Sequence, residues 1–307
     1  MGLGENNTML GENCMTVTVL TPTYNRKYVI NRLYKSLIRQ TCKDFEWLVV
    51  DDGSSDETDK EIEKYILEHK ITIRYIKQKN GGKHRALNAG IATIENAITF
   101  IVDSDDYLRE NAIEEILEAH KCFNNLTNIC GFSFLRCYPN GEINGPKFKQ
   151  SPYVSDYITC RMNEGIWGDK AEAYYTKCLK EFPFLETEGE KFLFEDYVWI
   201  QMAEKYNTVH INKAIYVGDY LEDGLTNNID RQKINNPIGM MKRGYISFSP
   251  KCNLKNKIRA MMMFTAYGKI AGYNEKFLMN TSRNKNAFVL IWPLSFLYWM
   301  KLKRIKV

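Results

Sequence analysis

The chain has 307 residues, of which 44% are hydrophobic and 26% are charged, so it can bury a substantial core. This length favours one large domain with an appendage, and the composition excludes a largely disordered chain. The formal net charge of +5 is modest, and no basic stripe interleaved with aromatic residues appears in the first two thirds of the sequence, so nucleic acid is not an expected partner.

The cysteines and the N-terminus indicate the cellular setting. The 8 cysteines lie at scattered spacings without a C-x-x-C pair, which is typical of reduced structural thiols and not of a zinc site. Residues 1–14 have neither a basic start nor an apolar run, so we interpret them as a flexible tail and not as a secretory signal. We therefore expect the catalytic part to be cytoplasmic.

Short β-rich runs alternate with amphipathic helical stretches from Thr16 onward. The expected strands cover residues 16–20, 45–50, 71–76 and 97–102, and the expected helices lie around residues 30–38, 62–66 and 87–94. This order predicts an α/β fold with a mostly parallel, Rossmann-like sheet flanked by helices. Ser54 and Glu57 have the spacing of a capping box ahead of the second helix.

The alternation loosens after Leu108. We expect residues 15–228 to form the catalytic domain, with residues 15–106 binding the donor and residues 107–228 forming the acceptor side. A stretch containing proline and glycine, residues 138–168, is expected to supply acceptor-binding loops. Residues 229–307 are expected to form a helical C-terminal region.

Two acidic clusters follow predicted strands, Asp51-Asp52 after the second and Asp103-Ser104-Asp105-Asp106 after the fourth. In open α/β sheets ligands bind at the carboxyl ends of the strands, so both clusters should converge on one crevice. The D-x-D spacing of Asp103 and Asp105 can hold Mn²⁺ or Mg²⁺ through oxygen, with a diphosphate completing the coordination shell. The alternative is an ordinary acidic turn that caps the next helix.

Three further segments supply candidate donor-binding residues. The loop after the first strand places Pro22, Thr23, Tyr24 and Arg26 where an aromatic face and an arginine could seat a nucleobase. A carboxylate of the Asp51-Asp52 pair could accept hydrogen bonds from a ring N–H or from ribose hydroxyls, although the same loop could simply lead into a helix capped by Ser54.

The glycine-rich segment after the third strand, Gly81-Gly82-Lys83-His84, precedes a helix. Its glycines would let the backbone approach a phosphate, and Lys83 adds positive charge. His84 by itself is more typical of a structural residue, but its cationic neighbours make a diphosphate contact an equal alternative.

Four motifs in this order resemble the family 2 glycosyltransferases with a GT-A fold. They are Thr21-Pro22-Thr23-Tyr24-Asn25-Arg26, Val49-Val50-Asp51-Asp52-Gly53-Ser54, residues 80–90 and Asp103-Ser104-Asp105-Asp106. The resemblance runs from about residue 16 to about residue 228. It implies that Pro22, Tyr24, Asp51 and Lys83 line the nucleotide, that Asp103 touches the ribose or the metal together with neighbouring Ser104, and that Asp105 binds the metal.

The family also places an acidic pair late in the domain, and Glu195-Asp196 fits that position at the start of a predicted helix. The resemblance implies that Asp196 is the general base for an inverting reaction, with Glu195 as the alternative. An acidic pair that merely stabilises the first turn of a helix is the structural alternative. A segment at residues 220–226 would form a lid over the diphosphate. The Gln-x-x-Arg-Trp motif of processive synthases is absent, so one sugar per encounter is expected.

The C-terminal segment, residues 285–307, is apolar and aromatic with a basic cluster. Its apolar part is too short to span a bilayer and contains Pro293, which we expect to interrupt a helix. We expect the segment to lie on a membrane surface, with packing onto the domain or onto a second copy as the alternative.

The motifs and the resemblance together imply an inverting, metal-dependent, non-processive transferase that moves a sugar from a UDP-sugar to a glycan or lipid-linked acceptor, with UDP implied by the resemblance only. Its expected place is the inner face of the cell membrane, in the synthesis of a cell-surface polysaccharide such as a capsule. A nucleotidyltransferase and a non-catalytic glycan-binding scaffold are the alternatives. A nucleotidyltransferase usually has a glycine-rich loop after its first strand, and residues 21–26 contain no glycine. A non-catalytic scaffold does not need the carboxylates of Asp105 and Asp196.

Overall fold

The computed structural model describes residues 15–218 and 229–305. Within them, one sheet of nine strands has the order β3-β2-β1-β4-β8-β6-β9-β5, with β7 paired to β9. The strands are β1 (Thr16–Thr23), β2 (Phe45–Asp51), β3 (Thr72–Lys77), β4 (Ala97–Ile101), β5 (Tyr107–Leu108), β6 (Ile129–Cys137), β7 (Tyr153–Ser155), β8 (Lys170–Tyr175) and β9 (Asn207–Val217). The predicted α/β fold is confirmed, including the four strands of the N-terminal half.

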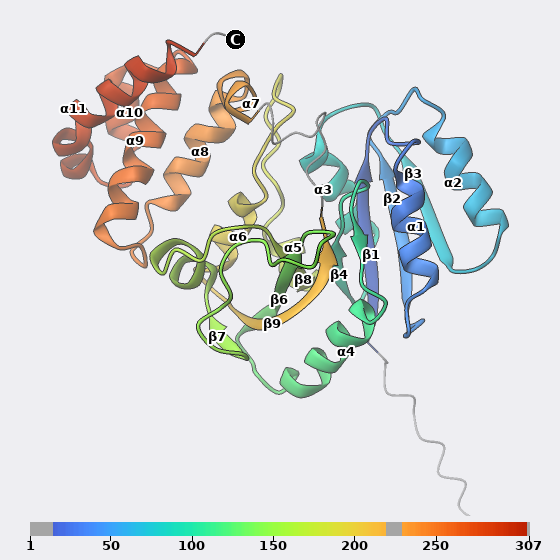
Figure 1. The fold of residues 1–307 in the computed structure, drawn as a ribbon. Helices are drawn as coiled ribbons and strands as arrows, with labels where there is room; N and C mark the ends of the chain where they lie inside the picture. The colour runs from blue at the N-terminus through green and yellow to red at the C-terminus, as the bar shows by residue number, and fades with distance from the viewer. Residues whose placement is uncertain (1–14, 219–228, 306–307) are drawn as a thin grey trace, which may run out of the picture.

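Helices flank this sheet and continue beyond it (Figure 1). The part of the chain that forms the sheet contains α1 (Ile30–Ile38), α2 (Thr58–Leu67), α3 (Lys83–Thr93), α4 (Ala112–Phe123), α5 (Thr176–Glu181), α6 (Asp196–Met202) and a π-helical turn at Ile158–Asn163. The C-terminal region contains α7 (Ile229–Asn235), α8 (Pro237–Ser247), α9 (Leu254–Ile270), α10 (Glu275–Thr281) and α11 (Lys285–Leu302).

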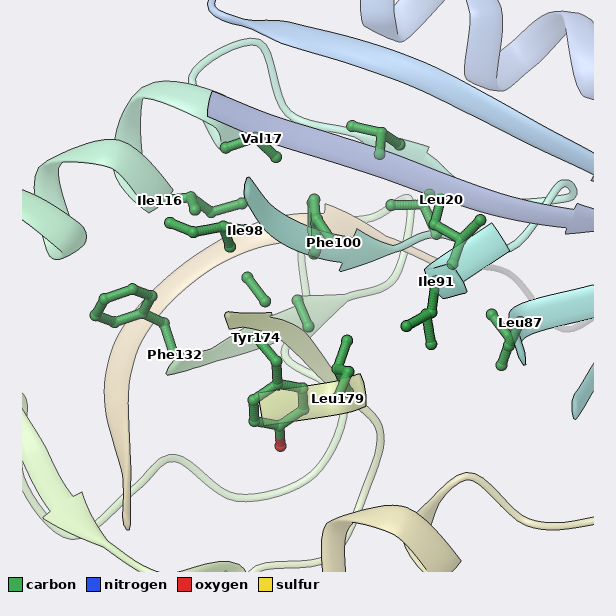
Figure 2. Close-up of a cluster of buried hydrophobic side chains, with 14 of the residues drawn as sticks. Val17, Leu20, Leu87, Ile91, Ile98, Phe100, Ile116, Phe132, Tyr174 and Leu179 are labelled. Atoms are coloured by element: carbon green, nitrogen blue, oxygen red, sulfur yellow. The ribbon is translucent and has the colours of Figure 1, made fainter. Parts of the chain in front are cut away.

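The apolar runs of the sequence form the main core. Strand β2 has Trp47, Leu48, Val49 and Val50 fully buried, as expected for a strand covered on both faces. Figure 2 shows part of this core, where side chains of β1, β4, β6 and β8 meet those of α3, α4 and α5. The tight core holds the strand ends, and thus the loops that follow them, in fixed positions.

Strand direction brings distant loops to one edge of the sheet. Strands β3, β2, β1 and β4 are parallel, and Thr23 is paired with Asp51 in the register of β1 and β2. Strand β8 runs antiparallel to β4, so its first residues lie at the edge where β4 ends. Strand β6 is antiparallel to β8, and β9 is parallel to β6, so both also end there. The second half of the sheet is therefore mixed.

The predicted capping box at Ser54 and Glu57 is wrong. Helix α2 begins at Thr58, and Asp56 Oδ1 accepts hydrogen bonds from the Thr58 backbone N–H at 3.1 Å and from Thr58 Oγ1 at 2.5 Å. The Ser54 hydroxyl instead accepts from the Asn25 N–H at 2.8 Å. Tertiary contact with the loop after β1 thus outweighs the local capping pattern.

The C-terminal helices have their own apolar core, separate from that of the sheet, and lie at one side of it (Figure 1). Glu190 joins the two parts, because its carboxylate accepts hydrogen bonds from the backbone N–H groups of Ile238 at 2.6 Å and Gly239 at 2.7 Å. In return Asn236 Oδ1 accepts from the N–H of Lys191 at 2.8 Å. These bonds satisfy the free amides at the start of α8 and attach that helix to the catalytic domain.

Helix α11 is continuous through Pro293, so the expected interruption is wrong. The helix is capped by Asn284, whose side chain accepts from the Ala287 N–H at 2.9 Å, and it packs on α9 through buried Phe288 and Ile291. Packing therefore compensates for the hydrogen bond that proline cannot donate. Among the described residues, no helix is both long and apolar enough to cross a bilayer.

Candidate active site

A cavity of about 700 Å³ opens at the edge where β1, β2, β4, β6 and β9 end. All predicted site residues line it except Asp51 and His84: Pro22, Thr23, Tyr24, Arg26, Asp52, Gly82, Lys83, Asp103, Ser104, Asp105, Glu195 and Asp196. Residues that come from loops more than 170 positions apart in the chain thus share one cavity. The lid segment, residues 220–226, lies outside the described residues.

Asp51 is fully buried and is not among the residues that line the cavity, so its nucleotide contact stays a prediction. Its carboxylate accepts hydrogen bonds from the Ser54 backbone N–H at 2.7 Å and from the Tyr75 hydroxyl at 2.6 Å. Burial, followed by this hydrogen bond, raises the pKa of Tyr75 well above its ordinary value. Asp51 therefore stabilises the loop after β2, and Asp52 is the member of the pair that lines the cavity.

Asp52 holds the glycine-rich loop. Its two oxygens accept hydrogen bonds from the backbone N–H groups of Gly81 at 2.8 Å and Gly82 at 2.7 Å, and from the side chains of Gln78 at 2.8 Å and Asn80 at 3.1 Å. The N–H groups of Gly81 and Gly82 thus donate to Asp52, whereas we expected the backbone of this loop to approach a phosphate. The loop keeps its shape through a carboxylate from the neighbouring strand.

His84 is 3% exposed and is not among the residues that line the cavity, so its donor contact also stays a prediction. Burial lowers the pKa of His84, as expected for an imidazole taken out of water. The structural interpretation of this histidine is the one that fits.

Lys83 connects the two halves of the cavity. Its ammonium lies 2.5 Å from Asp103 Oδ1 on the donor side and 2.6 Å from Glu195 Oε1 on the acceptor side. Burial would lower the pKa of Lys83, but these two carboxylates raise it well above its ordinary value. Lys83 is therefore charged, and it links the acidic run after β4 to the acidic pair at the start of α6.

In the acidic run after β4, the pKa values of Asp103 and Asp105 are shifted in opposite directions. Burial would raise the pKa of Asp103, but Lys83 and Arg136 lower it, whereas burial and the nearby charge of Asp103 raise the pKa of Asp105. A cation between Asp103 and Asp105 would relieve this repulsion. Among residues 15–218 and 229–305, no group of three or more acidic, histidine or cysteine side chains could hold a metal. The pair fits a cation that keeps waters or binds phosphate oxygens as its other ligands.

Asp106 has a different role. Its Oδ2 accepts hydrogen bonds from Arg136 Nη2 and from the Tyr216 hydroxyl, both at 2.7 Å, and the same hydroxyl accepts from the Asp103 N–H at 3.0 Å. Burial raises the pKa of Asp106 to about 6. Gly218 allows this cluster to form, because a Cβ there would overlap the Arg136 guanidinium. Sequence analysis did not identify Arg136 or Tyr216, which carry no motif and come from β6 and β9.

The acidic pair Glu195-Asp196 stands at the N-terminus of α6, as predicted, but its two members face different partners. Glu195 is paired with Lys83 on the donor side. Asp196 is held by Arg243 of α8, whose Nε donates to Asp196 Oδ1 at 2.6 Å and whose Nη2 donates to Oδ2. Sequence analysis missed Arg243, since a single arginine in a helix gives no signal.

The remaining wall belongs to the acceptor half. Tyr157 and Arg161, from the stretch predicted to carry acceptor-binding loops, line the cavity with Glu172 of β8 and Trp199 of α6. Burial raises the pKa of Glu172 to about 7, against the opposing effect of Arg161. The wall thus combines the aromatic rings of Tyr157 and Trp199 with the charged or polar groups of Arg161 and Glu172, a lining suited to the ring and hydroxyls of a sugar.

Comparisons with known proteins agree with this arrangement. The family model described as "Glycosyl transferase family 2" matches residues 18–159. Glycosyltransferase GlyA of Streptococcus pneumoniae is 36% identical over 100 residues, which are 33% of this chain and 14% of GlyA. The poly(ribitol-phosphate) beta-N-acetylglucosaminyltransferase TarS of Staphylococcus aureus is 32% identical over 103 residues, 33% of this chain and 18% of TarS. The alignments thus span less than a fifth of either relative.

Solved structures extend the likeness to nearly the whole chain. The structure of TarS residues 1–349 in complex with UDP-GlcNAc matches with a TM-score of 0.60 at 19% identity, covering 94% of this chain and 90% of that one. The mannosyltransferase PcManGT of Pyrobaculum calidifontis, in complex with GDP-Man and Mn²⁺, matches with a TM-score of 0.55 at 15% identity, covering 94% and 81%. Fold and cavity together define a protein of the GT-A class. More narrowly, the segment at residues 18–159, slightly less than half of the chain, carries the match to glycosyl transferase family 2.

The contact between the glycine-rich loop and residue 191 gives a first prediction. Gly82 has φ +99°, and a Cβ there would overlap the backbone carbonyl of Lys191. We expect Gly82→Ala to lower the free energy of unfolding by at least about 2 kcal/mol, since backbone strain of this kind costs about 1–3 kcal/mol before any clash is added. Urea denaturation followed by circular dichroism measures the change.

Gly141→Ala is the matched control. Gly141 has a similar φ of +88°, but a Cβ there would meet nothing within 4 Å, so this variant carries the backbone strain without the overlap. It should therefore lose clearly less stability than Gly82→Ala. Equal losses for the two variants would contradict the assigned contact between Gly82 and Lys191.

Proposed function

We propose that the protein is an inverting, metal-dependent, non-processive glycosyltransferase that uses a UDP-sugar. The observation that carries this proposal is that Asp103, Asp105 and Asp196 line one cavity, in which Lys83 is ion-paired with both Asp103 and Glu195. The family match and the binding of UDP-GlcNAc by TarS support a nucleotide-sugar donor. The acceptor is proposed to be a hydroxyl of a glycan or lipid-linked saccharide in cell-surface polysaccharide synthesis.

On this proposal the donor half binds the leaving group. Tyr24 and Arg26 contact the nucleoside, and Lys83 contacts the diphosphate. Asp103 and Asp105 would hold Mn²⁺ or Mg²⁺, which when bound neutralises charge on the departing diphosphate. The Mn²⁺ in the mannosyltransferase structure supports a cation in this role.

The acceptor half supplies the base. Asp196 takes the proton of the acceptor hydroxyl while the oxygen of that hydroxyl forms a bond to the anomeric carbon. The bond from the anomeric carbon to the diphosphate breaks at the same time, on the opposite face, and the nucleoside diphosphate leaves. Attack from the face opposite the leaving group inverts the configuration of the sugar.

The alternatives have less support. Neither the family match nor the relatives reported above favours a nucleotidyltransferase. A non-catalytic scaffold would not require acidic side chains from both halves to face one cavity. A transferase accounts both for the family match and for the acidic side chains that line one cavity.

The metal-site proposal is tested with Asp105→Asn. Release of UDP from UDP-GlcNAc in the presence of Mn²⁺ should fall at least about a hundredfold, because a bound cation contributes several kcal/mol to charge stabilisation. Asp44→Asn, at an exposed site remote from the cavity, is the control. A panel of UDP-sugars serves if UDP-GlcNAc is not the donor. Undiminished turnover of Asp105→Asn would remove the metal from this site.

The two members of the acidic pair are separated by a second experiment. Asp196→Asn should keep the Kd for the UDP-sugar and lose about 10²–10⁴-fold in transfer rate, the usual contribution of a general base. Glu195→Gln should mainly weaken donor binding, because Glu195 is paired with Lys83. Calorimetric titration and initial rates measure the two effects. The opposite outcome would exchange the roles of Glu195 and Asp196.

We also propose that α11 binds the inner face of an anionic membrane. Its exposed residues include Leu290 at 80%, Leu294 at 48% and Leu297 at 65%, which form one stripe at helical spacing. The helix contains no acidic residue, and Lys301 and Arg304 are exposed beside the stripe. An apolar stripe with neighbouring cations suits the boundary between lipid headgroups and acyl chains.

The membrane proposal predicts a specific loss of vesicle binding. The double variant Leu290→Asn, Leu297→Asn should bind phosphatidylglycerol vesicles at least about tenfold more weakly, because burying one leucine contributes about 1.5–3 kcal/mol. Leu254→Asn is the control, since Leu254 is 74% exposed on α9, outside this stripe. Sedimentation with vesicles measures binding, and equal binding by the double variant would rule out α11 as the contact.

A further inference from the structure

The ion pair between Arg243 and Asp196 joins the C-terminal helices to the proposed base. Arg243 Nε donates to Asp196 Oδ1 at 2.6 Å, and Nη2 donates to Oδ2, so the guanidinium grips both carboxylate oxygens. The two side chains are only 24% and 19% exposed. An ion pair shielded from water in this way is coupled more strongly than a surface pair.

Arg243 is itself held from three sides. Its guanidinium lies over the Phe194 ring at 4.9 Å, and Nη1 is 3.4 Å from Met263 Sδ of α9. On the same helix, Gly244 lets α8 approach α9, because a Cβ there would overlap the backbone of Phe264. Together with the bonds from Glu190 to the start of α8, these contacts fix where the guanidinium stands.

The bidentate geometry leaves the base able to act. Each carboxylate oxygen has two lone pairs, and Arg243 takes one from each oxygen. The second lone pair of either oxygen remains for the proton of an acceptor hydroxyl. Burial alone would lower the pKa of Arg243, but Asp196 raises it well above its ordinary value, so the guanidinium keeps its charge.

We infer that Arg243 is a positioning residue for Asp196, and that the helices α8–α11 complete the active site of the catalytic domain. This inference rests on the proposed function, in which Asp196 is the base. It gives the C-terminal region a catalytic purpose in addition to membrane contact. Lys83 has the corresponding place beside Glu195, so each member of the acidic pair is oriented from a different part of the chain.

The experiment compares Arg243→Met, Arg243→Lys and Arg243→Ala with wild type in the full-length chain. Arg243→Met should lower kcat for turnover of the UDP-sugar with Mn²⁺ about 10²-fold, the effect of a misplaced catalytic group, while the Kd for the donor stays unchanged. Arg243→Lys should recover part of kcat, because it restores the charge without the fork. Millimolar guanidinium should raise the activity of Arg243→Ala.

Lys242→Met is the matched control, because Lys242 is the exposed neighbour on the same helix and loses the same charge. It should resemble wild type in kcat, and guanidinium should not raise its activity.

The outcomes distinguish the inference from the function on which it rests. Wild-type kcat in Arg243→Met, or a matching loss of donor binding and of thermal stability in all Arg243 variants without guanidinium rescue, would overturn the positioning role. A wild-type protein that neither binds nor turns over any UDP-sugar in the panel would overturn the proposed function, and the inference with it.

Discussion

Partially buried carboxylates need partners, and this requirement organises the cavity edge of the sheet. Asp52 is satisfied by backbone amides of the glycine-rich loop, Asp103 by Lys83, Asp106 by Arg136, and Asp196 by Arg243. Each partner comes from a different strand, loop or helix. The loops after β2, β3, β4 and β6 and the helix α8 are therefore held together by the same charges that are proposed to bind a donor and activate an acceptor.

The distribution of these partners divides the cavity into two halves. Lys83 reaches from the donor side to Glu195, and Arg243 reaches from the C-terminal helices to Asp196. Two adjacent acidic residues thus belong to different electrostatic environments. This division gives a physical reason for assigning different roles to Glu195 and Asp196, which their position in the sequence does not provide.

The same constraint explains why the donor half is rigid. Gly82 passes so close to Lys191 that no side chain fits, and Lys191 Nζ donates to Asn80 Oδ1 at 2.7 Å. Arg85 binds the Thr187 carbonyl at 2.7 Å. The glycine-rich loop and the segment before α6 therefore form one interlocked unit. A unit of this kind can hold charged groups in place before substrates arrive, which is the condition for electrostatic stabilisation of a developing charge.

Periodicity was enough to predict the N-terminal strands and the start of a helix at Asp196, because both depend on local patterns. The position of Asp52, Asp103 and Asp105 after parallel strands was enough to predict that they line one cavity, because such strands end at the same edge of the sheet. Local patterns misassigned the capping box and Pro293, and they did not indicate that Asp51 and His84 are buried away from the cavity wall, because tertiary packing determines which side chain faces a cavity and which helix continues. Arg136, Tyr216 and Arg243 were beyond prediction from one sequence. In the sequence, Arg136 and Tyr216 lie 30 and 110 positions from Asp106, and Arg243 lies 47 positions from Asp196. Only the folded sheet and the C-terminal helices packed beside it bring these side chains to their carboxylates.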